Sequence, residues 1–218
     1  MNHPLSKMDI FSIGELKINL GSGRKTYPGF LNIDKAKLPE TNLIYDMEKL
    51  PLPFSDNSVS EIICEHVLEH LDNFPQFLEE LYRITKQGGI WRFVVPYYKY
   101  EGTFRDPTHK CFFSENTFDY FTEGNTFDYY SCVRLKILRK VLRNSSKTNI
   151  QTTIKRFREY IPFKRFFNLF LWNIYSEVYF ELKVVKENRR ENGEKNEREC
   201  KREKCKLPSE RDWRGLKR

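Results

Sequence analysis

Small residues and carboxylates recur at the ends of three short apolar runs near the start of the chain. The first run gives way to Gly21, Ser22 and Gly23, the second ends at Asp34, and the third ends at Asp46. Glycines after a strand let the backbone approach a ligand closely and expose its N–H groups, and an acid at the end of the next strand can accept hydrogen bonds from both hydroxyls of a ribose. The pattern therefore predicts a site for a nucleoside-bearing cofactor.

A second group of polar residues follows the fourth apolar run, EIIC. It begins with Glu65 and continues as His66, Glu69 and His70, which have the H-x-x-E-H spacing of an inverted zinc-protease motif. The two histidines of such a motif share one face of a helix. A zinc site also needs a third protein ligand in a suitable position, and the motif supplies none. We therefore predict the start of a helix here and no metal site, with Glu69 and His70 packing or facing solvent.

Seven short apolar runs predict the strands that must position these residues. They are 17–20, 30–33, 42–45, 60–64, 90–95, 133–137 and 177–185. Apolar residues at helical spacing predict a helix over 73–86, ended by Gly88 and Gly89. Only residues 24–29 separate the glycine turn from the second strand, whereas a parallel crossover usually needs about a dozen residues. The first crossover helix is therefore expected to be short or missing.

The order of these motifs over residues 16–96 resembles that of the class I S-adenosylmethionine-dependent methyltransferases, in the group whose domain is called methyltransferase type 11. The resemblance implies an α/β fold with a Rossmann-like, seven-stranded, mostly parallel sheet, helices on both faces and an antiparallel last strand. It also implies S-adenosyl-L-methionine as the cofactor. The residues that the resemblance assigns to cofactor binding are Gly21, Ser22, Gly23, Asp34, Asp46, Met47 and Glu65.

The resemblance also implies a role for each part of that set. The glycine turn is expected near the methionine carboxylate, Asp34 on the ribose hydroxyls and Asp46 near the adenine amino group, while Glu65 and His66 are expected beside the sulfonium. The family often carries an acid two residues before the first glycine, where this chain has Asn19. An uncharged amide at that position predicts weaker cofactor binding. The alternative is a Rossmann-like domain without a ligand, because a Gly-x-Gly turn often serves turn geometry alone.

The segment 96–130, rich in Phe and Tyr, is predicted to form a lid and an acceptor pocket. In related enzymes this part of the chain closes over the acceptor, and a neutral imidazole or a carboxylate can take a proton from an acceptor hydroxyl as the methyl group moves. The catalytic candidates are His66, Asp106 and His109. The alternative is that Asp106 and Pro107 only make a turn and that His109 is a packed or surface histidine.

The function that the resemblance predicts is methyl transfer to a small-molecule acceptor or to a glycan or lipid-linked one. Two alternatives remain open: a catalytically inactive scaffold that binds the cofactor, and an RNA methyltransferase that uses the basic C-terminal part. Residues 1–132 carry 13 Lys and Arg against 19 Asp and Glu, a balance of −6, while the rest of the chain has a balance of +14. Such a division suggests different partners for the two parts, although a solvated charged tail alone would produce it.

The C-terminal third leaves several interpretations open. Residues 156–175 combine aromatic and basic side chains and predict a buried helix, with a membrane-surface helix as the second interpretation and a nucleic-acid platform as the third. No recognised RNA-binding arrangement supports the third, so nucleic acid is disfavoured as a partner. We assign 1–185 to the methyltransferase domain and 186–218, where 21 of 33 residues are charged, to a disordered tail or a lone charged helix. The oligomeric state is not predicted.

Cysteines and apolar runs bear on the compartment. The five cysteines are odd in number and scattered, which favours reduced thiols over a disulfide framework. No apolar run approaches the roughly 20 residues that span a bilayer. The N-terminal residues, interrupted by Pro4, Lys7 and Asp9, do not match a signal peptide. A cytoplasmic location is therefore expected.

Overall fold

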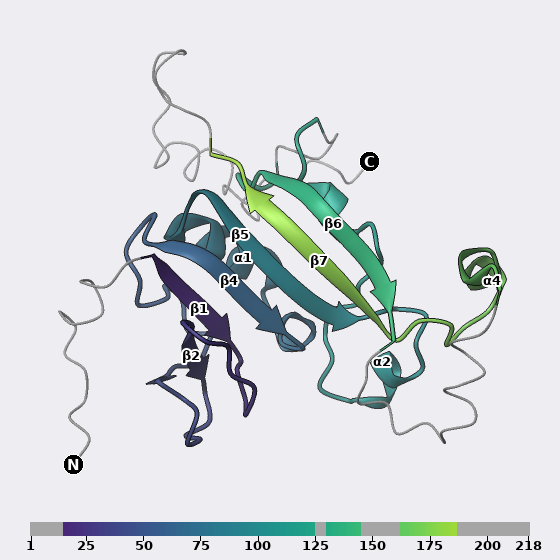
Figure 1. The fold of residues 1–218 in the computed structure, drawn as a ribbon, viewed down its shortest axis with the longest axis horizontal. Helices are drawn as coiled ribbons and strands as arrows, with labels where there is room; N and C mark the ends of the chain where they lie inside the picture. The colour runs from purple at the N-terminus through teal and green to yellow at the C-terminus, as the bar shows by residue number, and fades with distance from the viewer. Residues whose placement is uncertain (1–14, 125–129, 145–161, 187–218) are drawn as a thin grey trace, which may run out of the picture.

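The computed structural model describes residues 15–124, 130–144 and 162–186 (Figure 1). The described residues do not include the N-terminal residues 1–14, almost all of the charged tail or the N-terminal part of the aromatic and basic segment. The described residues form one seven-stranded sheet with the order β3-β2-β1-β4-β5-β7-β6. Its strands are β1 (Leu16–Leu20), β2 (Leu31–Asp34), β3 (Leu43–Ile44), β4 (Val59–Glu65), β5 (Thr85–Pro96), β6 (Leu135–Arg143) and β7 (Glu177–Val184).

The sheet is mostly parallel, which confirms the predicted Rossmann-like fold. Neighbours from β3 through β5 are parallel, and β7 is antiparallel to both β5 and β6. Figure 1 shows β7 running against the two strands beside it. The chain order reverses between β1 and β4, and open α/β sheets bind ligands in the crevice outside the carboxyl ends of the strands at such a point. The glycine turn, Asp34 and Glu65 all lie at that edge.

Burial of the central strands explains why they are continuous apolar runs. In β4 the successive residues Ile62, Ile63 and Cys64 are all buried. Successive side chains of a strand point to opposite faces, so both faces of the sheet are covered at this strand. Continuous apolar character without alternation is the expected pattern for such a strand.

The long helix α1 (Phe74–Ile84) connects β4 to β5 and lies behind the sheet in Figure 1. Its buried stripe includes Phe77, Leu78 and Leu81. The prediction that Gly88 and Gly89 end this helix is wrong, because α1 ends at Ile84 and both glycines lie inside β5. The hydroxyl of Thr85 donates to the carbonyl of Leu81 at 2.6 Å and accepts from the indole N–H of Trp91 at 2.9 Å, so the helix passes directly into the strand.

Within the described ranges, the remaining helices are short. They are the 3-10 turns η2 (Leu68–His70) and η3 (Thr117–Phe121) and the helices α2 (Gly102–Arg105) and α4 (Lys164–Phe170). The predicted helix at EHVLEHL is therefore only one 3-10 turn. Residues 24–29 contain no helix, as predicted from the short spacing. No helix among the described residues has both the length and the apolar character needed to cross a membrane.

The predicted burial of the aromatic and basic segment is wrong for the apolar residues of α4, although Ile174 further along is buried. Phe163 is 82% exposed and Phe170 is 70% exposed, and α4 stands away from the sheet in Figure 1. Helical spacing predicted a buried face, but α4 has only seven residues and attaches to the rest of the fold through polar contacts. The Lys99 ammonium donates to the carbonyl of Asn168 at 2.7 Å, and the Asn168 amide donates to the hydroxyl of Tyr97 at 2.9 Å.

Candidate cofactor and acceptor site

The glycine turn after β1 is closed by its own neighbours. Gly21 has φ +62° and Gly23 has φ +51°, both in the left-handed region that favours glycine. The backbone N–H of Ser22 donates to the carbonyl of Ile33 at 3.1 Å, and that of Gly23 donates to Oδ2 of Asp34 at 2.8 Å. Two of the three N–H groups expected to face a ligand therefore already donate hydrogen bonds within the protein. The turn can still let a ligand approach the backbone closely.

The space next to the turn is too small for any side chain at position 21. A Cβ atom there would lie 2.1 Å from Cγ2 of Val67, which follows β4. The turn after β1 is thus packed directly against the segment after β4, so the two strand ends that border the crevice are held together. Glycine is required at this position for both its backbone conformation and its small size.

Two carboxylates predicted to bind the cofactor follow neighbouring strands, with Asp34 at the end of β2 and Asp46 shortly after β3. Asp34 uses each carboxylate oxygen once, accepting from Gly23 and from the N–H of Ala36 at 2.8 Å. Each carboxylate oxygen can accept a second hydrogen bond, and the side chain is half-buried, so acceptor capacity remains for a diol. Asp46 lies two residues beyond Ile44, the register partner of Asp34, and Met47 beside it is buried.

The hydrogen bonds of Asn19 explain why an amide stands where the family pattern has an acid. It is 3% exposed, and its Nδ2 donates to the carbonyl of Lys25 at 2.9 Å and to Oδ1 of Asn32 at 3.0 Å. Both partners are acceptors, which a carboxylate could not satisfy. The amide therefore fixes the loop after the glycine turn against β2.

The carboxylate of Glu65, at the end of β4, is held by the loop between β1 and β2. Lys25 donates to Oε2 at 2.5 Å and the hydroxyl of Tyr27 donates to Oε1 at 2.6 Å. Burial favours the neutral acid, but the hydrogen bonds from Lys25 and Tyr27 outweigh it and lower the pKa of Glu65. An ionised carboxylate thus stands at the strand end where the resemblance places the sulfonium.

His66 follows Glu65 with φ +55°, a left-handed conformation that is uncommon for a residue with a side chain. Its Nδ1 lies 3.3 Å from Oε1 of Glu69 and its Nε2 lies 3.3 Å from Oε2 of Glu177, and both carboxylates are buried. Burial lowers the pKa of His66, but the contacts with Glu177 and Glu69 outweigh it and raise the pKa to about 9. An imidazolium ion has no lone pair to accept a proton, so this geometry suits fixed positive charge better than a general base.

The other two catalytic candidates lie in the segment after β5. Asp106 is exposed, and its Oδ1 accepts from the hydroxyl of Thr108 at 2.6 Å and from its N–H at 2.9 Å. These hydrogen bonds lower the pKa of Asp106. The side chain of His109 is 8% exposed, with Nδ1 2.8 Å from the carbonyl of Thr103 and Nε2 3.7 Å from Oδ2 of Asp106. Asp106 therefore does make a turn, and His109 is packed against the fold.

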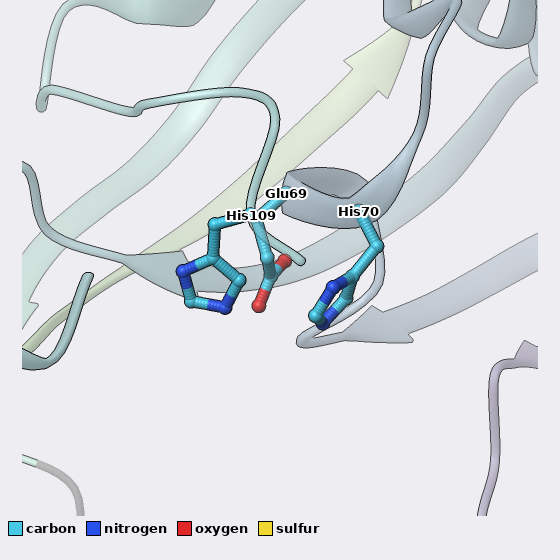
Figure 2. Close-up of side chains that lie close together, drawn as sticks. All are labelled: Glu69, His70 and His109. Carbon is cyan, nitrogen blue, oxygen red and sulfur yellow. The ribbon is translucent and has the colours of Figure 1, made fainter. Parts of the chain in front are cut away.

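His109 lies beside Glu69 and His70, which sequence reasoning left out of the site. One possible ligand atom from each of the three residues lies within 4.8 Å of the other two. Figure 2 shows the Glu69 carboxylate between the two imidazole rings, whose centroids are 4.9 Å apart. The H-x-x-E-H spacing marked two of the three residues, but the third comes from a distant part of the chain.

The predicted lid is anchored in the core along its second half. Phe113 and Phe118 are fully buried, and Phe118 lies 4.7 Å from Phe180 of β7 between ring centroids. The first part carries the exposed rings of Phe104 and Phe112. Phe104 stacks on Phe112 at 5.0 Å and lies 6.1 Å from Trp172. With the apolar residues of α4, these rings form what we call the exposed aromatic patch: Phe104, Phe112, Phe163, Phe166, Leu169, Phe170 and Trp172.

Comparison with known proteins finds a family that is similar to part of this chain. Residues 23–93 match the family model described as a methyltransferase domain, in the type 11 group. Over these residues the chain is similar to methyltransferase domains. The matched segment runs from the second glycine of the turn into β5 and includes Asp34, Asp46 and Glu65, three of the residues predicted to bind the cofactor. A search of curated proteins found no match to the chain.

Solved structures share the methyltransferase fold at low sequence identity. A chain from the complex of the Haloferax volcanii Trm112 methyltransferase activator matches with a TM-score of 0.52 and 18% identity, covering 80% of this chain and 84% of its own length. An S-adenosylmethionine-dependent methyltransferase from Archaeoglobus fulgidus matches with a TM-score of 0.51 and 16% identity, and the match covers 81% of this chain and 89% of that one. A third match is geranyl diphosphate C-methyltransferase from Streptomyces coelicolor, in complex with Mg²⁺, geranyl diphosphate and S-adenosyl-L-homocysteine. Its TM-score is 0.50 and its identity 11%, and the match covers 82% of this chain and 76% of that one.

Proposed function

We propose that the protein is a methyltransferase that uses S-adenosyl-L-methionine to methylate a small-molecule, glycan or lipid-linked acceptor. The observation that carries the proposal is the hydrogen bond from Gly23 to Asp34, which joins the glycine turn and the acidic strand end into one unit at the carboxyl edge of the sheet. The family match and the shared fold support the donor class. The cofactor fits this edge because Asp34 retains free acceptor capacity and because the backbone at Gly23 borders open space, where a Cβ would meet no atom within 4 Å.

Each part of the edge has a task in this proposal. Asp34 accepts from the ribose hydroxyls, Asp46 and Met47 flank the adenine, and the backbone of residues 21–23 approaches the methionine end. S-Adenosylmethionine supplies a methyl group already activated by the sulfonium charge, so the protein mainly aligns the donor with the acceptor and excludes water. The ionised Glu65 stabilises positive charge close to the donor.

The acceptor enters from the segment after β5. The exposed aromatic patch lies on that segment and on α4, with Lys164 and Arg165 beside it. Apolar and aromatic side chains flanked by Lys and Arg are typical of a surface that rests on a membrane interface. We therefore include peripheral membrane contact through this patch in the proposal, since such contact gives access to a lipid-linked acceptor.

A labelled-methyl transfer assay tests the proposed function. The full-length protein is incubated with S-adenosylmethionine carrying a radioactive methyl group and with cell extract, membrane and aqueous fractions separately. We expect label to appear in one fraction, and Asp34→Ala to abolish it. Binding of the donor without transfer to any fraction would favour the inactive scaffold, and label in RNA that disappears on removal of residues 186–218 would favour the RNA methyltransferase.

A further inference from the structure

The buried carboxylate of Glu69 lacks the hydrogen bonds that such a group requires. The side chain is 1% exposed, and neither Oε1 nor Oε2 makes a hydrogen bond within the described part of the chain. His66 lies 3.3 Å from Oε1, close enough for an ion pair, but it leaves Oε2 without a partner. Buried polar groups are nearly always paired, so an unpaired carboxylate oxygen here points to a missing cation or donor.

The two imidazoles beside Glu69 present lone pairs. His109 has Nδ1 2.8 Å from the carbonyl of Thr103, which can only accept, so Nδ1 carries the proton and Nε2 has the lone pair. His70 has Nδ1 2.9 Å from Oγ1 of Thr108, whose own proton goes to Asp106 at 2.6 Å. Nδ1 of His70 is therefore also the donor, and its Nε2 also has the lone pair.

Hydrogen bonds of this kind, from the ring N–H to a protein oxygen, are typical of metal-binding histidines. A ligating histidine almost always donates its other ring N–H to a protein oxygen, which fixes the tautomer and the ring orientation. The backbone also fixes the two segments, because the carbonyl of Glu69 accepts from the N–H groups of Lys110 at 2.7 Å and Cys111 at 3.0 Å. The three side chains in Figure 2 are thus held together by contacts other than their own.

We infer that Glu69, His70 and His109 bind a divalent first-row transition-metal ion of the Zn²⁺ class. Two imidazole nitrogens and one carboxylate oxygen form a donor set that suits Zn²⁺, Fe²⁺ and Co²⁺ better than Mg²⁺ or Ca²⁺, which prefer oxygen. The expectation from sequence was no metal, because the motif lacked a third ligand. His109 supplies that ligand from the segment after β5.

Three protein ligands leave at least one coordination position open, as in catalytic zinc sites. The site lies where the segment after β5 packs on the turn after β4, next to the edge proposed to hold the donor. Resting on the proposed function, the open position would take an oxygen of the acceptor. A bound metal ion lowers the pKa of a coordinated hydroxyl group and so makes it a better nucleophile.

Metal titration of the full-length protein tests the inference. The protein is stripped with a chelator, dialysed and titrated with Co²⁺ and then Zn²⁺, without S-adenosylmethionine, while the visible d–d bands of Co²⁺ are recorded. We expect one equivalent to bind and binding to weaken at least ten-fold in Glu69→Gln and in His109→Asn. His3→Ala removes the only histidine that lies outside the motif and the cluster, and it should bind as the wild type does.

Several outcomes would overturn the inference. They are an absence of saturable Co²⁺ binding, equal binding by His109→Asn and the wild type, and a sulfur-to-cobalt charge-transfer band that shows a thiolate ligand. Circular dichroism of both variants establishes that they are folded. A separate titration with S-adenosylmethionine keeps the proposed function distinct, because donor binding without metal binding refutes only the metal site, and metal binding without donor binding refutes only the proposed function.

Discussion

Replacement of Gly21 by alanine tests the close contact between the two strand ends that border the crevice. The new Cβ would lie 2.1 Å from Cγ2 of Val67 on a backbone with φ +62°. A left-handed conformation costs a residue with a side chain about 1–2 kcal/mol. Forcing an extra methyl group into packed space costs about 1–3 kcal/mol more. We expect Gly21→Ala to lower the free energy of unfolding by about 2–5 kcal/mol.

A matched control separates backbone strain from steric overlap. Gly29 also has a left-handed backbone, φ +78°, but a Cβ there would meet no atom within 4 Å. Gly29→Ala should therefore cost only the conformational part, about 1–2 kcal/mol. Urea unfolding monitored by circular dichroism gives both values. Equal destabilisation by the two substitutions would show that contact with Val67 does not restrict position 21.

A double-mutant cycle identifies the clashing partner. Val67→Ala removes the Cγ2 atom that the new methyl group would strike. The combined variant Gly21→Ala/Val67→Ala should be more stable than the sum of the single effects predicts, by about 1–3 kcal/mol. Strict additivity would mean that Val67 is not the source of the overlap.

Three further predictions concern the surroundings of this edge. Asn19→Asp replaces an amide donor with a carboxylate that faces two oxygens, and it should cost about 3 kcal/mol in urea unfolding, whereas a change under about 0.5 kcal/mol would contradict the assigned hydrogen bonds. The pKa of Glu65 is lower in the folded state than its usual value of 4.5, so the ionised carboxylate stabilises the fold above that pH and this stabilisation is lost as the pH falls. Between roughly pH 6 and pH 3 the wild type should therefore lose more stability than Glu65→Gln does. Parallel stability profiles of the two proteins over this range would contradict the prediction. Phe170→Ser with Trp172→Ser should reduce cosedimentation with anionic lipid vesicles without lowering thermal stability, and undiminished cosedimentation would exclude the patch as the contact surface.

The strand ends at the proposed cofactor edge were predictable from sequence because their signals are local. A glycine turn after one apolar run and an aspartate at the end of the next mark strand ends directly, and the short spacing over 24–29 correctly predicted the missing crossover helix. The predicted end of α1 was wrong because glycine pairs usually terminate helices. Here a buried hydrogen bond from the indole of Trp91 to the hydroxyl of Thr85 holds Thr85 in the strand.

The cluster around Glu69 was not predictable in the same way. Its third member, His109, reaches the other two only because the segment after β5 folds back and pairs with the turn after β4 through backbone hydrogen bonds. Such contacts leave no periodic pattern in the sequence. The exposure of α4 was also missed, because aromatic residues at helical spacing predict a buried face whether or not a neighbouring element covers it.

Calorimetric titration with S-adenosylmethionine asks directly whether the glycine turn and Asp34 hold the donor. Asp34→Ala is compared with Asp56→Ala, which removes an exposed aspartate just before β4, at the opposite edge of the sheet. We predict saturable binding by the wild type and by Asp56→Ala, and a loss of at least ten-fold in affinity for a folded Asp34→Ala. Absence of binding by the wild type, or equal affinity of all three proteins, would contradict the account.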